Sequence, residues 1–243
     1  MLKTFSLTDI GKKRTMNQDF IFTSENPVGN LPNLFIVADG MGGHNGGGYA
    51  SSYAVEVVTK VAKATLDTTP RKIFETAITI ANSEIRKKAS ESEELEGMGT
   101  TLVLACVVGD ILHVANVGDS RLYVAGDEIR QITVDHSYVE EMIKVGTLDR
   151  ESARNHPQKN IITRAIGADD SVIPDFFTVK LKKGDIVLMC SDGLTNMVAD
   201  EDILTILKKE RDIAGKAEKL ISAANDNGGK DNVAVVLVQP FED

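Results

Sequence analysis

The chain contains no tryptophan, and it has only two cysteines among its 243 residues. A small scaffold held by disulfides needs several cysteines and an oxidising compartment, so that class of protein is excluded. Cys106 and Cys190 both lie inside apolar, strand-like runs. We therefore expect two buried thiols in a protein of a reducing compartment.

Long hydrophobic runs and an excess of positive charge are also absent. Residues 1–20 contain no apolar core of a signal peptide, and every apolar stretch is far shorter than the roughly 18 residues of a membrane span. The chain has 27 Lys and Arg against 36 Asp and Glu, a net charge of -9, which disfavours nucleic acid as a partner. We expect a cytoplasmic monomer without membrane insertion.

The chain alternates blocks of strands with pairs of helices. Apolar residues at helical spacing predict two helices between Ala50 and Ser92, separated near Pro70. A meander of four strands is predicted between Thr100 and Thr133, because short Gly-Asp links separate its apolar runs. The other predicted elements are strands at 2–9, 19–24, 33–38, 175–181, 185–191 and 232–238, a glycine-rich turn at 40–48, a polar segment at 136–160 and helices at 200–209 and 212–226.

This order predicts an α+β fold. The strands need two sheets face to face, and each helix pair needs an apolar face to cover, so we expect a four-layer αββα sandwich with two mostly antiparallel sheets. At this length one domain is the default, and we predict a single domain over residues 1–243 with a flap at about 136–165.

Five aspartates follow apolar, strand-like runs or begin them. A strand end directs a side chain out of the core, and five carboxylates at one sheet edge would repel each other strongly. Divalent cations that prefer oxygen ligands, such as magnesium and manganese, relieve that repulsion. The pattern predicts a dinuclear metal enzyme, although aspartate is also common in turns. The five residues are Asp19, Asp39, Asp119, Asp192 and Asp231.

The glycine-rich run that starts at Gly40 is not a nucleotide-binding loop. A dinucleotide-binding fingerprint needs a third glycine where this chain has Asn45, and it needs a parallel sheet that the predicted meander excludes. No GK[ST] sequence is present, so a P-loop is also excluded. A glycine beside Asp39 instead allows close backbone approach, and the Gly40 carbonyl is itself a metal ligand candidate.

Two covalent phosphatase mechanisms are disfavoured, because each lacks one required residue. A cysteine-dependent phosphatase needs an arginine about six residues after the nucleophile, but Asn196 stands there after Cys190. A phosphoaspartate mechanism of the dehalogenase type needs a second aspartate two residues after Asp39, where this chain has Met41. Covalent catalysis through either residue is therefore disfavoured.

Arg14 and His44 are candidates for contact with a substrate. Arg14 precedes Asp19 by five residues and could grip a phosphate beside the metals, although alone it favours an ordinary solvated arginine. His44 could protonate a leaving alkoxide, but a lone histidine in a glycine-rich loop is more often simply exposed.

Taken together, six short motifs in order resemble the metal-dependent serine/threonine protein phosphatases of the PPM (PP2C) family. The similarity is to the bacterial single-domain members that oppose Hanks-type kinases, and it covers essentially the whole chain. The motifs are Arg14 to Asp19, Asp39 to His44, Gly99 to Thr101, Val117 to Arg121, Ser191 to Leu194 and Asp231 with Asn232, and Asp135 to Ser137 and Asn160 to Gly167 also match.

The resemblance implies roles for the candidate residues. Asp39 would bridge two Mn²⁺ or Mg²⁺ ions, the Gly40 carbonyl would bind one of them, and Asp192 and Asp231 would complete one site. Asp19 would act mostly through metal-bound water. Asp119 would help Asp192 to hold a third, weaker ion. Arg14 would bind the substrate phosphate, and His44 would protonate the leaving group after direct attack by a metal-bridging water.

The resemblance also implies the partners, and it leaves alternatives. The expected substrates are phosphorylated proteins, including a Ser/Thr kinase, and the flap would set substrate preference. Many bacterial members have an acidic residue where this chain has Gln18 or Gly48, so metal affinity is expected to differ rather than activity. Two other interpretations stay open: a non-catalytic module that docks phosphoproteins, and a phosphatase devoted to one anti-sigma antagonist.

Overall fold

Two antiparallel β-sheets form the centre of the protein in a computed structural model that describes residues 2–42 and 46–241. Every strand pairing in the described chain is antiparallel. The first sheet has the order β1 (Lys3–Asp9), β11 (Val233–Gln239), β10 (Ile186–Cys190), β7 (Arg121–Ala125) and β8 (Ile129–Gln131). The second has the order β2 (Asp19–Ser24), β3 (Leu34–Met41), β5 (Leu102–Val108), β6 (Ile111–Val117) and β9 (Asp175–Lys180), and β4 (Gly99–Thr100) pairs with β3.

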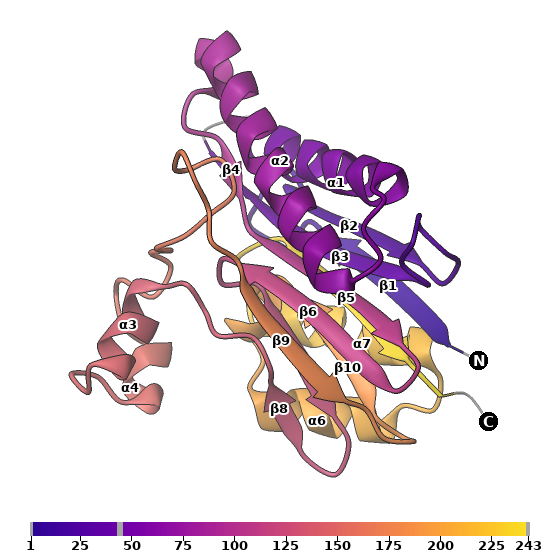
Figure 1. Ribbon diagram of the computed structural model, residues 1–243. Helices are drawn as coiled ribbons and strands as arrows, with labels where there is room; N and C mark the ends of the chain where they lie inside the picture. The colour runs from indigo at the N-terminus through magenta and orange to yellow at the C-terminus, as the bar shows by residue number, and fades with distance from the viewer. Residues whose placement is uncertain (1, 43–45, 242–243) are drawn as a thin grey trace.

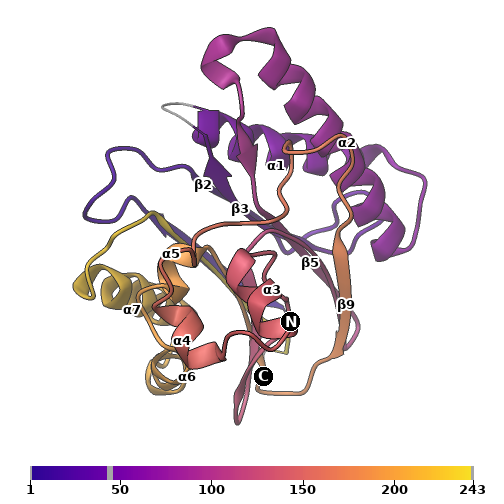
Figure 2. The same cartoon turned by 90° about the vertical axis from the view of Figure 1, so that its left-hand side faces the viewer.

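A helix pair covers the outer face of each sheet (Figures 1 and 2). α1 (Gly46–Ala64) and α2 (Pro70–Glu91) pack on the second sheet, and α6 (Asp200–Lys209) and α7 (Ile213–Asp226) pack on the first. The remaining helices are the 3-10 turn η1 (Glu93–Leu95), α3 (Tyr138–Lys144), α4 (Arg150–Arg154) and α5 (Asp192–Thr195). This arrangement confirms the predicted α+β fold with four layers.

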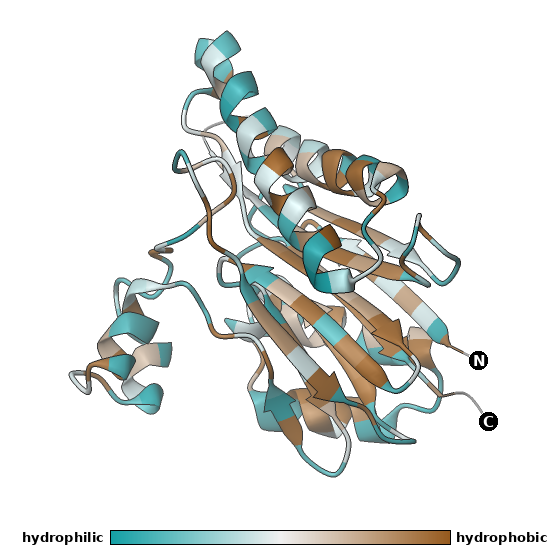
Figure 3. Cartoon of the chain, in the orientation of Figure 1, coloured by the Kyte–Doolittle hydropathy of each residue, from teal (hydrophilic) through white to brown (hydrophobic). Residues whose placement is uncertain are grey.

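Three apolar layers hold the sandwich together, one between the sheets and one beneath each helix pair. β5 shows how the sequence builds them, since Leu102, Leu104 and Cys106 face the helices. Its alternate residues Val103 and Ala105 face the other sheet. A strand buried on both faces reads as one continuous hydrophobic run, and Figure 3 shows these strands as largely hydrophobic. Each large side chain buried there contributes about 2 kcal/mol to folding.

The predicted meander between Thr100 and Thr133 is split between the two sheets. β5 and β6 lie in one sheet, whereas β7 and β8 lie in the other. The chain crosses at Gly118, whose φ of 107° favours glycine, and a Cβ there would lie 2.6 Å from Cβ of Thr101. Because both sheets present apolar faces, the hydrophobic pattern does not tell which sheet a strand joins.

α1 begins at Gly46, inside the run that was predicted as a turn, so that prediction is wrong for residues 46–48. The glycines allow two backbones to touch rather than a turn to form. A Cβ on Gly40 would lie 2.0 Å from the carbonyl oxygen of Gly47, and a Cβ on Gly47 would lie 2.7 Å from that of Gly40. The start of α1 is therefore pressed against the end of β3.

The segment 136–165 stands apart from the layers and carries α3 and α4 (Figures 1 and 2). Each short helix has a side-chain cap. The Ser137 hydroxyl accepts from the backbone N–H of Glu140 at 3.3 Å, and Oδ1 of Asp149 accepts from that of Ser152 at 2.8 Å. An isolated bridge between Ser137 and Ile162 closes the base of the segment.

Both cysteines are free and buried, as predicted. Burial raises the pKa of the Cys106 thiol to about 12, and it raises the pKa of the Cys190 thiol further still. Thiolates are the reactive form of cysteine, so neither side chain is a nucleophile near neutral pH. None of the described helices is long and apolar enough to cross a membrane.

Candidate active site

The first two aspartates lie opposite each other where β2 begins and β3 ends, since Asp19 and Asp39 are register partners. Three hydrogen bonds fix the backbone of Asp39. Its N–H donates to Oγ1 of Thr101 at 3.0 Å, and its carbonyl accepts from the Thr101 N–H and the Thr100 hydroxyl, each at 2.9 Å. The strand end thus aims the Asp39 carboxylate in one direction.

Asp19 is a buried carboxylate with one oxygen satisfied and one not. The Ser191 hydroxyl donates to its Oδ2 at 2.6 Å, and that hydroxyl in turn accepts from the backbone N–H of Ala234 at 2.9 Å. Oδ1 of Asp19 has no hydrogen-bond partner in the described chain. An orphaned buried carboxylate oxygen is costly, so a cation or a proton is needed at this point.

The next two carboxylates come from the first sheet and from the crossing between sheets. Asp192 begins α5, and Nδ2 of Asn196 donates to its Oδ2 at 2.9 Å. Asp119 is buried and directly follows the crossing glycine Gly118. A Cβ on Gly193 would lie 1.9 Å from the carbonyl oxygen of Asn232, so the residue after Asp192 must be a glycine for α5 to pack there.

Asn232 joins the N-terminal loop to the last strand, a role that sequence reasoning did not assign. Its Oδ1 accepts from the backbone N–H of Gln18 at 2.8 Å. Its Nδ2 donates to the carbonyl oxygens of Ile10 and Met16, each at 2.9 Å. The loop that carries Arg14 is therefore held against β11 and against the neighbouring Asp231. The one signal for this contact in the sequence is the side-chain amide of Asn232, directly after the candidate metal ligand Asp231.

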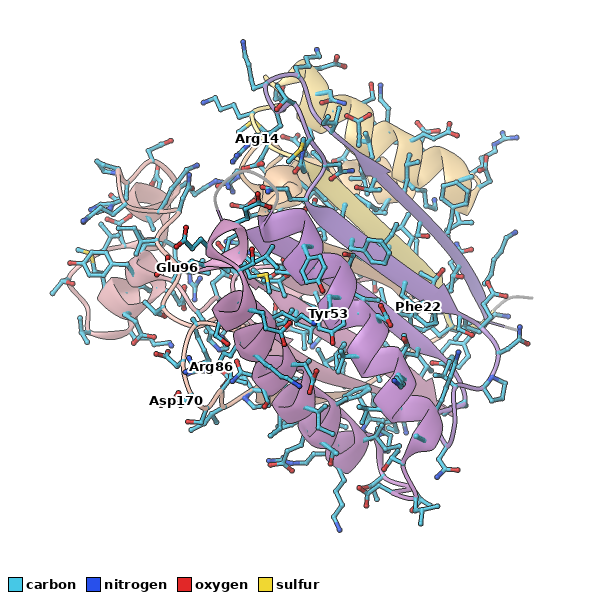
Figure 4. All side chains as sticks on the ribbon, turned by 90° about the horizontal axis from the view of Figure 1, so that it is seen from above. Arg14, Phe22, Tyr53, Arg86, Glu96 and Asp170 are labelled. Carbon is cyan, nitrogen blue, oxygen red and sulfur yellow. The ribbon has the colours of Figure 1, made fainter. Side chains whose placement is uncertain are left out.

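Arg14 lies at the rim of the acidic group, where its Nη2 donates to Oδ2 of Asp231 at 2.7 Å. Its side chain is half exposed, so the guanidinium can also reach solvent or a substrate. The hydrogen bond to Asp231 is the main cause that raises the pKa of Arg14, and the charges of Asp39 and Asp192 add to it. Figure 4 shows Arg14 well away from Tyr53 on α1. His44 lies outside the described residues.

Burial and mutual repulsion disfavour the charged forms of the clustered carboxylates. Burial is the main cause that raises the pKa of Asp19 to about 7 and that of Asp192 to about 6. Burial also raises the pKa of Asp39 and that of Asp119 well above the ordinary value. The charges of all four other aspartates, including Asp231, raise the pKa of Asp39 further. The fold therefore brings the five predicted residues into one electrostatic group.

The donor set fits a cation that prefers oxygen. Within the described residues, no three acidic, histidine or cysteine side chains converge closely enough to form a shell by themselves. Magnesium and manganese commonly keep several waters and take few protein carboxylates, so such a shell does not need three converging side chains. The orphaned Oδ1 of Asp19 and the raised pKa values mark uncompensated negative charge that a divalent cation would neutralise.

A second network, also not assigned from the sequence, lies beside Asp119. Arg121 donates from Nε and Nη2 to the Asp135 carboxylate, with the shortest contact 2.7 Å. Its Nη1 donates to the Tyr123 hydroxyl at 3.0 Å, and that hydroxyl donates to Oδ1 of Asp200 at 3.3 Å. The network forms one wall of a pocket of about 350 Å³ that Asp119 and Asp192 also line.

The fold and the carboxylate group together define a class of phosphatase. Two stacked antiparallel sheets flanked by helix pairs hold the acidic group at the strand ends, and the family model for protein phosphatase 2C matches residues 11–237. The chain belongs to this family, and it is a PP2C-type serine/threonine phosphoprotein phosphatase.

Curated relatives match the chain over nearly its whole length. It is 42% identical to protein phosphatase PhpP of Streptococcus pneumoniae, over 98% of this chain and 97% of that protein. It is 43% identical to the serine/threonine phosphatase stp of Listeria monocytogenes, over 96% of this chain and 93% of that protein. These two relatives bear out the resemblance stated from the motifs.

Solved structures agree with this assignment. The S. agalactiae serine/threonine phosphatase superposes with a TM-score of 0.92 at 40% identity, covering 99% of this chain and 100% of that one. The catalytic domain of the phosphatase PstP, solved in complex with two manganese ions, has a TM-score of 0.87 at 32% identity and covers 99% of each chain. A relative with the same fold therefore binds two manganese ions.

Proposed function

We propose that this phosphatase hydrolyses phosphoserine and phosphothreonine in proteins with two Mn²⁺ or Mg²⁺ ions held by its carboxylate group. The single observation that carries the proposal is the orphaned Oδ1 of buried Asp19 inside a group of mutually repelling carboxylates. Clustered buried carboxylates destabilise a fold unless a counter-ion neutralises their charge, so this group favours a bound cation. The manganese-bound relative PstP supports the same conclusion.

The proposed ligands are the residues predicted from the sequence. Asp39 would hold both ions, the Gly40 carbonyl would bind one of them, Asp192 and Asp231 would complete one site, and Asp19 would act mostly through water. Asp119 and Asp192 would hold a third, weaker ion. When bound, the ions supply Lewis acidity and lower the pKa of water, which favours direct attack on phosphorus without a phosphoenzyme.

The other side chains position these groups and the substrate. Ser191 fixes Asp19, and Asn196 fixes Asp192, so both carboxylates are pre-oriented. Arg14 would donate its remaining N–H groups to the phosphoryl oxygens while it stays bonded to Asp231. His44 would donate a proton to the leaving alkoxide. The buried thiol of Cys190 takes no part, because burial raises its pKa.

The proposal extends to the setting of the enzyme. We infer a monomeric cytoplasmic enzyme that opposes a Hanks-type Ser/Thr kinase and accepts that kinase among its phosphoprotein substrates. Residues 1–243 would form one domain, with the segment 136–165 as its flap. The two ends of the chain meet in one sheet, because β1 pairs with β11 along its whole length. This pairing supports a single domain.

The direct test is phosphate release from a phosphothreonine peptide, with manganese and after exhaustive chelation. We expect turnover with manganese or magnesium, loss of turnover with chelator, and recovery when the metal is restored. Calcium and zinc at the same concentration serve as controls for ion type. Full activity in the chelated protein would show that the carboxylate group works without metal.

The role of His44 has a separate test in the leaving group. Substitution His44→Ala should slow hydrolysis of a phosphothreonine peptide by about tenfold or more, because an alkoxide needs a proton. Nitrophenyl phosphate should be slowed much less, since nitrophenolate leaves without protonation. Equal slowing of both substrates would remove His44 from the acid role.

A further inference from the structure

The pocket of about 350 Å³ lies between the segment 136–165 and the carboxylate group. Asp119 and Asp192 stand at one side, so the pocket opens directly onto the proposed catalytic centre. α3, α4 and the loop after α4 form the opposite side. Its charged lining residues are Asp119, Arg121, Asp135, Glu140, Arg150, Glu151, Arg154, Lys159, Asp192 and Asp200.

Two of the four cations in this lining already have carboxylate partners. Arg121 is held by Asp135, and Nη2 of Arg150 lies 3.3 Å from Oε1 of Glu140. The side chains of Arg154 and Lys159 differ, because neither makes a hydrogen bond or an ion pair with any residue of the described chain. Lys159 is half buried at the pocket wall. Two cations therefore face the pocket without a counter-charge of their own.

The electrostatics of Lys159 show that further cations are close. Burial is the main cause that lowers the pKa of Lys159, and the charges of Lys230, Arg154 and Arg121 lower it further. The charge of Asp192 acts in the opposite direction and is the largest of the charge effects on Lys159, and Asp192 is a proposed metal ligand. The lining also has six carboxylates, but Asp119 and Asp192 are proposed metal ligands, and two others are paired with arginines. Arg154 and Lys159 are therefore the cations of the pocket that are available to attract an anion.

We propose that this pocket is a substrate subsite for a second anionic side chain, a phosphate or a carboxylate, close in sequence to the phosphoresidue that is hydrolysed. The inference rests on the proposed function, and it adds the class of substrate segment that the enzyme prefers. Arg154 would contribute a planar fork and Lys159 a point charge, which together suit either oxyanion. The preferred substrates are acidic or multiply phosphorylated segments.

The experiment compares kcat/KM, with saturating manganese, for a set of phosphothreonine peptides. One peptide has neutral neighbours, and the others carry glutamate, phosphoserine or lysine at each nearby position on either side. The glutamate and phosphoserine sets distinguish a carboxylate from a phosphate as the second anion. At its best position, we expect an anion to raise kcat/KM about fivefold, the effect of one partly exposed charged contact.

Variants at the pocket assign the preference to its residues. Lys159→Met and Arg154→Gln should each reduce the ratio between anionic and neutral peptides, and Lys159→Glu should shift the preference to lysine-flanked peptides. Lys144→Met is the matched control, because Lys144 lies on α3 of the same segment but pairs with Glu141 outside the pocket lining. The control should keep the wild-type ratio. Added salt should reduce the ratio through screening.

Three results would overturn the inference, and they differ from one another. Turnover with equal kcat/KM for neutral and anionic peptides would reject the subsite alone and leave the proposed function intact. An unchanged ratio in both Lys159→Glu and Arg154→Gln would move the preference to another surface and also reject this pocket. No phosphate release from any peptide with manganese or magnesium would reject the proposed function, and this inference with it.

Discussion

The carboxylate group and the segment 136–165 face the same pocket, yet the protein holds them in different ways. Asp19 accepts a buried hydrogen bond from the Ser191 hydroxyl, and the backbone N–H of Asp39 donates to Oγ1 of Thr101. Asp39 also lies near the end of β3, whose residues 34–38 are all buried. Between residues 141 and 164, only Ala153 is buried. Elements with few buried contacts open at low free energy. The fold therefore fixes the proposed catalytic groups and leaves the proposed substrate-binding segment adjustable.

The largest effect is expected in the carboxylate group, which the fold holds rigidly. Asp39→Ala, Asp192→Ala and Asp231→Ala should each lower kcat/KM by at least about 100-fold, because each removes a proposed ligand of the ions that stabilise developing charge. Circular dichroism should show an intact fold, and thermal melts should lose the rise that manganese produces in the wild type. A variant with wild-type turnover at low manganese would remove that residue from the ligand set.

The second prediction concerns the stability of the metal-free protein. Asp19 has its pKa raised to about 7 in the fold, so the folded chain holds a proton that the unfolded chain has released above about pH 4. The free energy of unfolding should therefore fall as the pH rises from about 5 to about 8, by on the order of 3 kcal/mol. Chemical denaturation in chelator measures it.

Saturating manganese is the control for that prediction. Metal-bound carboxylates stay ionised, so stability with manganese should not fall over the same pH range. If the metal-free protein instead gained stability as the pH rose, the carboxylates would not repel each other in solution.

At the rim between the two regions, Arg14→Lys should raise KM for phosphopeptides about tenfold. A point charge replaces a guanidinium that can bond Asp231 and a phosphate together. Lys13→Met is the matched control, since it changes a neighbouring exposed charge in the same loop. Steady-state kinetics on peptide and small substrates measure the effect. An unchanged KM for both would identify Arg14 as a structural partner of Asp231.

Substitution of Asp119 tests whether the metal-binding group extends to the wall of the pocket. Asp119→Ala should lower turnover a few-fold and raise the manganese concentration needed for half-maximal activity, because a site with few carboxylates is weak. The melting temperature with saturating manganese should stay near that of the wild type. A lower melting temperature with normal metal dependence would show that Asp119 only shapes the crossing between the sheets.

The smallest effect is expected in the adjustable segment. Asp149→Ala removes the cap of α4 and should destabilise that short helix. Because so little of the segment is buried, the global melting temperature should barely change. We expect kcat/KM to fall about twofold for acidic phosphopeptides and to stay constant for nitrophenyl phosphate. A clear drop in global stability would show that the segment folds together with the core.

Sequence patterns predicted the elements and the acidic residues well. An apolar run that starts or stops at an aspartate marks a strand end whether or not its partners are known, and five such positions identified the group. The same reasoning missed Asn232, because its partners Gln18, Ile10 and Met16 lie more than 200 positions away. It also missed the pairing of Arg121 with Asp135, which depends on how the chain turns after β8.

The sequence by itself determined most of the secondary structure, the layered fold class and which residues are chemically able to hold metal and phosphate. Those properties follow from local periodicity and from side-chain chemistry, which act over a few residues. Only the tertiary structure decided that β6 and β7 lie in different sheets, that the glycines at 46–48 are helical, and that Arg154 and Lys159 face Asp192 across a pocket. Such contacts join distant segments, and packing between surfaces of equal hydrophobicity selects them.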